Sequence, residues 1–327
     1  NDYLTSIGVE SVETDLGEYI QQMDGEAPYH IVTPAMHKSK EDVAQLFNKH
    51  LGTDISLTPE QLTLVARKNL RDKYVQAEIG ITGANFILSD IGGIALTENE
   101  GNARLSVAWP KTHVVIVGIE KVIPSINDLG LFWPLLSTFG TGQQVTVYNS
   151  IISGPKKEDE TDGPEEMYVI LLDNGRTELL ANAKSREALY CIRCGACLNA
   201  CPVYKNIGGH SYGTTYSGPI GSVITPHLKG MEDFKHLSYA SSLCGNCTEV
   251  CAVKINLHEL LLENRRESVE EGLSTFSEKT AWKLWKLASL NRSFMNAGNG
   301  KIKTKIVNSI FTAWNKNRSD LHFSQKT

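Results

Sequence analysis

Seven cysteines constrain this chain more than any other feature, because all of them lie between positions 191 and 251 of 327 residues. The first four form the run Cys191-Ile-Arg-Cys194-Gly-Ala-Cys197-Leu-Asn-Ala-Cys201-Pro202, and the other three form Cys244-Gly-Asn-Cys247-Thr-Glu-Val-Cys251. An odd number of cysteines at two-residue gaps does not suit a disulfide framework. Clustered thiolates of this kind are typical of a metal site in a reducing compartment.

The first run has the C-x2-C-x2-C-x3-C-P spacing of bacterial ferredoxins. Two-residue gaps wrap the backbone around one face of a cubane cluster, while the fourth cysteine, turned away before Pro202, ordinarily binds the other cluster. The spacing therefore predicts two iron-sulfur clusters, expected to be of the [4Fe-4S] type. We assign Cys191, Cys194, Cys197 and Cys251 to cluster one, and Cys201, Cys244 and Cys247 to cluster two.

Cluster two then has only three thiolates. It is expected to be a [3Fe-4S] cluster, or a [4Fe-4S] cluster whose last iron takes water, substrate or a non-cysteine ligand. His210, His227 and His236 lie between the motifs and are candidates for that ligand, although a histidine there more often forms a hydrogen bond or faces solvent. Structural zinc is the alternative for these cysteines, but zinc takes four ligands per ion and seven cysteines fit it poorly.

Composition places the chain among ordinary globular proteins, with 41% hydrophobic and 21% charged residues. A formal net charge of -5 argues against a general nucleic-acid binder. No run approaches the ~20 apolar residues that span a bilayer, and no secretory signal is visible, so we expect a cytoplasmic protein. The chain begins with Asn1 rather than Met, and we expect that an N-terminal part of the native protein is missing.

Residues 1–182 are expected to form an α/β domain with a largely parallel sheet. Ser39 with Asp42, and Thr58 with Gln61, have the pattern of capping boxes that open helices. Hairpins are expected around Asp90 to Gly93 and at Asn174-Gly175. The predicted strands are Asn85 to Leu88, Gly93 to Thr97, His113 to Val117, Val145 to Ile152 and Met167 to Leu172.

Residues 183–265 are expected to form the cysteine-bearing second domain, and residues 266–327 a basic helical tail. From Ser274 to the end, ten Lys or Arg stand against two acidic residues, with Trp282, Trp285 and Trp314 among them. Such a tail is expected to dock an acidic partner or rest on a membrane surface. The alternative is an amphipathic helix packed on its own domain.

Several longer segments resemble one family, the LutB-type lactate-utilisation iron-sulfur proteins. Those resembling its LUD domain are VETDLGEYI, HIVTPAMHKSKEDVAQLF, GITGANFILSD, TENEGNARL and VGIEKVIPSINDL, and those resembling its ferredoxin domain are CIRCGACLNACPVY, GGHSYGTTYSGPIG and SSLCGNCTEVCAVKINLHELL. The likeness covers nearly all of the chain. It implies an α/β LUD domain, similar to the sugar-phosphate isomerase fold, followed by a mainly α-helical two-cluster ferredoxin domain.

The resemblance also implies a role: an electron carrier that works with partner proteins in a redox complex oxidising L-lactate to pyruvate. The alternatives are an enzyme in its own right, which uses an open cluster iron or a pocket of the LUD domain, and an iron-sulfur sensor or scaffold. The chain departs from the family pattern in three places. Asp90-Ile91-Gly92-Gly93-Ile94 lacks the usual threonines of that turn, Ala252 replaces a proline, and an N-terminal helical part is absent.

Glu100, Asn102 and Arg104 are the candidate lining of a small-carboxylate pocket, with Arg104 pairing to the ligand. The alternative is a turn in which Gly101 is left-handed and Arg104 pairs with Glu100. His37 is expected to be a surface or capping residue rather than a catalytic base. The Gly140-Thr-Gly142 segment is not a dinucleotide fingerprint, because it follows a helix and leads into a strand.

Overall fold

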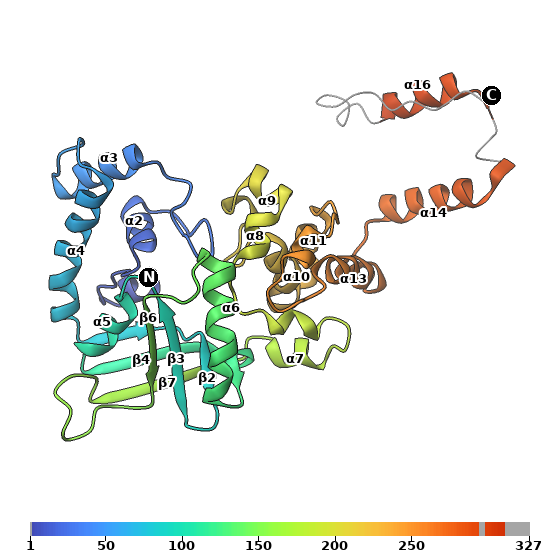
Figure 1. The fold of residues 1–327 in the computed structure, drawn as a ribbon. Helices are drawn as coiled ribbons and strands as arrows, with labels where there is room; N and C mark the ends of the chain where they lie inside the picture. The colour runs from blue at the N-terminus through green and yellow to red at the C-terminus, as the bar shows by residue number, and fades with distance from the viewer. Residues whose placement is uncertain (1, 294–297, 311–327) are drawn as a thin grey trace. The chain divides into compact units, whose positions relative to one another are not determined.

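The computed structural model describes residues 2–293 and 298–310 and forms two compact units (Figure 1). The first unit is Asn1–Glu270 and the second is Glu271–Thr327. The predicted boundary between residues 182 and 183 lies inside the first unit. The predicted boundary between 265 and 266 lies within helix α13, Leu257–Glu270.

The first unit begins with four helices: α1 Asp2–Ser6, α2 Leu16–Asp24, α3 Lys40–Leu51 and α4 Pro59–Gln76. Both predicted capping boxes are confirmed. Ser39 and Thr58 each accept a hydrogen bond from the third backbone N–H of their helix, and Asp42 and Gln61 bond back to the caps. Apolar side chains of α2, α3 and α4 pack into one core around Phe47, which is fully buried.

Two sheets follow in the α/β region. The first has the order β1-β4-β7 and is parallel throughout, with β1 Ile79–Thr82, β4 Thr112–Gly118 and β7 Glu166–Leu172. The second has the order β5-β2-β3-β6 and is mixed, with β5 Val122–Ile123, β2 Phe86–Leu88, β3 Gly93–Glu98 and β6 Tyr148–Ile152. Strands form in all five predicted places, but β1 and β5 were missed because they are only four and two residues long.

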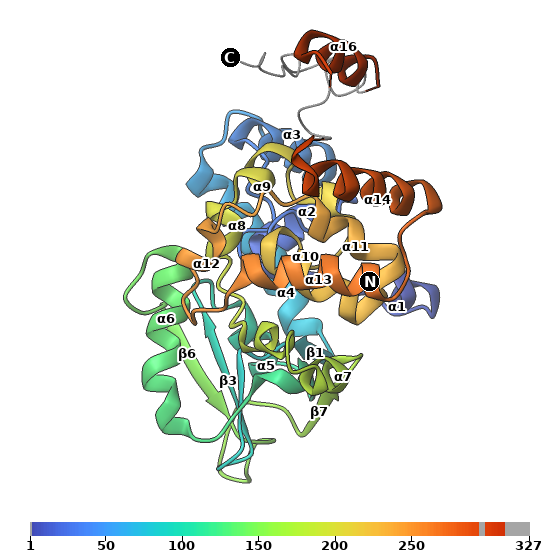
Figure 2. The same ribbon diagram turned by 90° about the vertical axis from the view of Figure 1, so that its right-hand side faces the viewer.

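Two helices accompany these strands, α5 Asn102–Ala108 and α6 Leu129–Thr141. Helix α6 packs on the four-stranded sheet, where Leu129 and Leu136 join the core formed by Phe86 and Leu88 (Figure 2). Gly142 ends α6 in a left-handed conformation. The Gly140-Thr-Gly142 segment therefore terminates a helix and does not form a nucleotide-binding turn.

One predicted hairpin is confirmed and the other is wrong. β2 and β3 pair antiparallel across the turn at Asp90 to Gly93. At Asn174-Gly175 the chain turns with φ of 44° and 82° but enters helix α7, Arg176–Ala181. The reason is local, because the Asp173 carboxylate accepts the backbone N–H of Thr177 at 2.7 Å and so starts a helix.

The cysteine region is helical. Its elements after α7 are η3 Arg186–Tyr190, α8 Ala196–Ala200, α9 Pro202–Ile207, η4 His210–Tyr212, α10 Gly218–Lys229, α11 Met231–Tyr239, α12 Asn246–Glu249 and α13. Helix α10 is the centre of this region, with Val223 and Ile224 fully buried against Leu257 and Leu261 of α13. Cys197, Cys247 and Cys251 belong to the same core.

The second unit contains α14 Phe276–Leu290 and α16 Gly300–Ile310. Trp282 and Trp285 of α14 are 68% and 60% exposed, so neither is packed into a core. Trp314 lies outside the described residues. Whether this tail docks on a partner, rests on a membrane surface or packs on its own domain stays a prediction. Within the described ranges, no helix combines the length and apolar character needed to cross a membrane.

Candidate metal centre

Four of the seven cysteines line one apolar cavity. They are Cys191, Cys194, Cys197 and Cys251, and the other walls include Ile31, Ile192, Ile220, Val253 and Ile255. Burial raises the pKa of Cys194 and raises that of Cys197 well above its ordinary value, and the neighbouring cysteines add to both shifts. Four crowded thiolates are therefore unfavourable here unless a cation compensates them.

The other three cysteines are Cys201, Cys244 and Cys247. Burial raises the pKa of the Cys247 thiol, and Cys201 and Cys244 raise it further. The two motifs are tied together directly, because the Asn246 side-chain amide donates to the backbone oxygen of Ala200 at 2.9 Å. The four cysteines assigned to cluster one thus line one cavity. The allocation of all seven cysteines to two clusters stays a prediction.

The backbone presents donors to the sulfurs. The N–H groups of Arg193, Tyr204 and Ile255 donate to Cys191, Cys201 and Cys251 at 3.4, 3.5 and 3.3 Å. Such donors stabilise a thiolate. Arg193 also lines the four-cysteine cavity, and its buried Nη1 has no hydrogen-bond partner. A buried N–H without an acceptor is costly, and a cluster sulfide or thiolate would satisfy it. These residues fit an iron-sulfur cluster.

Part of the α/β region covers this site. Ile192, Cys194, Ala252 and Val253 pack in one core with Phe132, Trp133 and Leu136 of α6. Lys121, which follows β4, donates to the backbone oxygen of Cys191 at 2.8 Å. Burial lowers the Lys121 pKa to about 8, and the nearby Arg193 adds to that effect. The site therefore depends on a segment that lies far from the cysteines in the sequence.

A buried charge cluster lies beside the same cavity. Glu120 accepts from Arg176 Nε at 2.6 Å and from Arg193 Nη2 at 3.3 Å. The side chains of Glu120 and Arg176 are only 3% and 4% exposed. The Arg193 guanidinium also lies 4.3 Å from the centre of the Tyr216 ring. One carboxylate thus pairs with two cations beside the four-cysteine cavity, and nothing in the cysteine spacing indicates this.

The three candidate histidine ligands each bond elsewhere. His210 Nε2 is 2.7 Å from the Ala27 oxygen, His227 Nε2 is 2.9 Å from Asn264 Oδ1, and His236 Nδ1 is 2.9 Å from the Asp233 oxygen. His37 pairs with Glu26 at 3.0 Å and stacks on Tyr29. This agrees with the expected surface role for His37.

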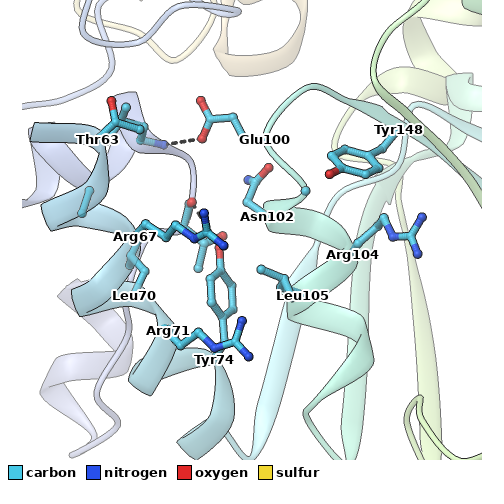
Figure 3. A pocket seen from close by; sticks show the side chains of 14 residues that line it. Thr63, Arg67, Leu70, Arg71, Tyr74, Glu100, Asn102, Arg104, Leu105 and Tyr148 are labelled. Atoms are coloured by element: carbon cyan, nitrogen blue, oxygen red, sulfur yellow. Dashed lines mark hydrogen bonds between the residues drawn. The ribbon is translucent and has the colours of Figure 1, made fainter. Parts of the chain in front are cut away.

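A separate cavity of about 670 Å³ lies between α4 and the α5 turn (Figure 3). Glu100, Asn102 and Arg104 all line it, together with Arg67 and Arg71 of α4. The Arg104 guanidinium lies 5.4 Å from the centre of the Tyr148 ring and extends away from α4, whereas Arg67 and Arg71 reach toward the cavity (Figure 3). The two α4 arginines were missed because the pocket joins segments some thirty residues apart in sequence.

Glu100 has a structural partner. Its carboxylate accepts the backbone N–H of Leu16 at 3.0 Å, and burial raises its pKa. Gly101 is left-handed with φ of 78°, as the alternative turn required, but Arg104 does not pair with Glu100. Beside this pocket is a second cavity of about 470 Å³ lined by Glu13 and Glu18. Burial there raises the pKa of Glu18 to about 7, with Glu13 adding to the shift.

Comparison with known proteins decides the family. The model of the LUD domain matches residues 4–172, which is more than half of the chain. The chain belongs to the LUD domain family. A 4Fe-4S dicluster domain matches residues 187–255 and contains all seven cysteines. The LUD domain and the dicluster domain therefore follow each other in the order that the sequence predicted.

Curated relatives share both parts. Lactate utilization protein B of Bacillus cytotoxicus is 45% identical over 97% of this chain, and that of Geobacillus sp. (strain WCH70) is 47% identical over 95%. The chain covers 66% and 65% of the lengths of these two relatives. A crystal structure of a DUF162 family protein from Deinococcus radiodurans is 16% identical, covers 47% of this chain and 93% of its own, and has a TM-score of 0.24. That score is too low to carry an argument.

In the LUD domain the turn at Asp90 has a structural role. The Asp90 carboxylate accepts the backbone N–H of Ile126 at 3.0 Å and so joins the β2–β3 turn to the segment before α6.

Proposed function

We propose that the chain is an iron-sulfur electron-transfer subunit that acts with partner proteins in the oxidation of L-lactate to pyruvate. The observation that carries the proposal is that all seven cysteines lie within a 4Fe-4S dicluster domain and that four of them line one cavity. The similarity to lactate utilization protein B of two other bacteria supports the lactate-utilisation context. The assignment of Cys191, Cys194, Cys197 and Cys251 to cluster one, and of the other three to cluster two, is part of this proposal.

Electron stoichiometry supports a relay. Oxidation of lactate releases two electrons, whereas each bound cluster carries one, so two adjacent clusters accept them in single steps. The sequence has no nicotinamide or flavin fingerprint to accept a hydride. A relay needs a donor on one side and an acceptor on the other, so other proteins of the complex are expected to supply both.

The first prediction concerns reduction of the clusters. Lactate alone is expected to leave the visible absorbance of the anaerobic chain unchanged, and lactate with the partner proteins is expected to bleach it. The measurement compares the chain alone, with lactate, and with lactate plus partners. D-lactate with the same partners is the control for the substrate.

Two outcomes would redirect the assignment. Bleaching by lactate alone, with pyruvate released over many turnovers, would identify an enzyme in its own right. Absence of bleaching even with all partners, when dithionite does reduce the clusters, would favour a sensor or scaffold.

We also propose that the cavity beside α4 binds a small carboxylate. Arg67 and Arg71 are four residues apart and therefore lie on one face of the helix, with Asn102 opposite them. Two guanidinium groups offer paired donors that match carboxylate oxygens. Arg104, which lies at the Tyr148 side, is expected to contribute from the rim of the pocket.

The second prediction tests this pocket. Replacing Arg67 and Arg71 together with glutamine is expected to weaken lactate or pyruvate binding by roughly tenfold or more, because charge-assisted hydrogen bonds are lost. Arg104→Lys is expected to have a smaller effect, since lysine lacks the bidentate fork. Lys68→Gln removes a charge from the same helix at a position that does not line the cavity, and it is the matched control. Calorimetry that finds no binding to the unmutated protein, with or without partners, would remove this pocket from the proposal.

A further inference from the structure

The two cysteine motifs are related by a constant offset of fifty residues. Cys194, Cys197 and Cys201 correspond to Cys244, Cys247 and Cys251. The first motif has one more ligand, Cys191, and the same offset leads to Ser241. The second motif is therefore a complete C-x2-C-x2-C-x3-C pattern in which serine replaces the first cysteine.

The backbone repeats at the same offset. Arg193 and Leu243 have φ of 67° and 54°, a conformation that residues other than glycine rarely adopt. Gly195 and Gly245 have φ of 79° and 81°, and each immediately precedes a short helix, α8 or α12. Because two unusual conformations recur at matched positions, the two loops share a local backbone conformation around their cysteines.

The hydroxyl of Ser241 takes the place of a thiolate within that fold. In the first loop the Arg193 N–H donates to Cys191 Sγ at 3.4 Å, and in the second loop the Leu243 N–H donates to Ser241 Oγ at 3.1 Å. An oxygen that accepts one N–H retains a lone pair. The Arg265 guanidinium fixes this turn from outside, because its Nη2 donates to the backbone oxygen of Ser241 at 2.8 Å.

We infer that Ser241 Oγ is the fourth ligand of cluster two. This inference rests on the proposed cluster assignment, in which each loop supplies three ligands to its own cluster and one to the other. Cluster one takes three from the first loop and Cys251 from the second. By the same rule cluster two takes Ser241, Cys244 and Cys247 from the second loop and Cys201 from the first, which completes four.

The chemistry of this ligand differs from that of cysteine. The hydroxyl proton passes to solvent when the oxygen binds iron. An alkoxide is a harder donor than a thiolate and favours the more oxidised iron, so the reduction potential of cluster two is lower than that of its all-cysteine counterpart. The iron at Ser241 is also the one held least firmly, because the other three have soft thiolate ligands.

The third prediction compares Ser241→Ala, Ser241→Cys and the neighbouring control Ser242→Ala in anaerobically reconstituted full chain. Ser241→Ala is expected to lose one iron of about eight and to show the EPR signal of an oxidised three-iron cluster. Ser241→Cys is expected to keep all its iron and to raise the midpoint potential of cluster two in an EPR-monitored redox titration. Ser242 is exposed and adjacent, so its replacement is expected to match the unmutated protein.

A four-iron signal and a midpoint potential in both Ser241 variants equal to those of the unmutated chain would overturn the inference. In that case the last iron takes its ligand from solvent or from another residue. If Ser241→Ala fails to fold, Ser241→Cys still tests the inference. Its side chain can accept the hydrogen bond from the Leu243 N–H, as the Ser241 side chain does. Failure of the unmutated chain to bind iron at all would refute the proposed function instead, so the two failures are distinguishable.

Discussion

Replacing Cys251 with alanine is expected to remove cluster one, although the other three cysteines of that cluster belong to the first motif. Cys251 shares the apolar cavity with Cys191, Cys194 and Cys197, and a cubane that loses one of its thiolates there leaves an iron without a ligand. Iron and sulfide content is expected to fall by about half, from two four-iron clusters to one. EPR of the reduced protein is expected to retain the signal of cluster two.

Replacing Cys201 is expected to affect cluster two instead. Cys201→Ala is expected to remove cluster two and to leave cluster one, because the proposed assignment places Cys201 with Cys244 and Cys247. Each crossed ligand has a matched variant within its own group. Cys251→Ala is expected to resemble Cys194→Ala, and Cys201→Ala to resemble Cys244→Ala. A Cys251→Ala spectrum that matched Cys244→Ala would show that the ligands do not cross between loops.

The second large effect is expected at Glu120. Its carboxylate lies between Arg176 and Arg193, all three largely buried, so Glu120→Gln leaves two cations without a counter-charge. Removing one partner of a buried ion pair typically costs about 3–5 kcal/mol. For a compact unit of this size that corresponds to a fall in the thermal midpoint of roughly 10 °C. Cluster one is expected to be lost first, because Arg193 lies in its wall.

Differential scanning calorimetry measures the thermal midpoint of each variant. All scans use one rate, because an iron-sulfur protein commonly unfolds irreversibly and its midpoint then depends on the scan rate. Glu165→Gln is the matched control, because the Lys156–Glu165 pair is exposed and its atoms are 3.9 Å apart. An exposed pair contributes at most about 1 kcal/mol. Equal midpoints for Glu120→Gln and Glu165→Gln would contradict a structural role for the buried charge cluster.

Local sequence patterns predicted the elements whose signals lie within a few residues. The capping boxes at Ser39 and Thr58 start α3 and α4 as expected, because a cap needs only a side chain and the N–H three residues on. The strand β4 was found for a similar reason, since a run of β-branched residues favours extended backbone. The short strands β1 and β5 were missed, as their pairing partners rather than their own residues define them.

The cysteine spacing by itself determined the class of metal site, because two-residue gaps fix how a backbone wraps a cubane. It also predicted which cysteines share a cluster, but it did not single out Ser241, which precedes the second motif. Only the tertiary structure pointed to Ser241 as a ligand, because the second loop repeats the left-handed residue and the N–H donor of the first loop. Only the tertiary structure also brought Lys121, Glu120 and α6 to the four-cysteine cavity, and Arg67 and Arg71 opposite Asn102. These contacts join residues far apart in the chain, and no local pattern encodes them, since they depend on how whole sheets and helices pack.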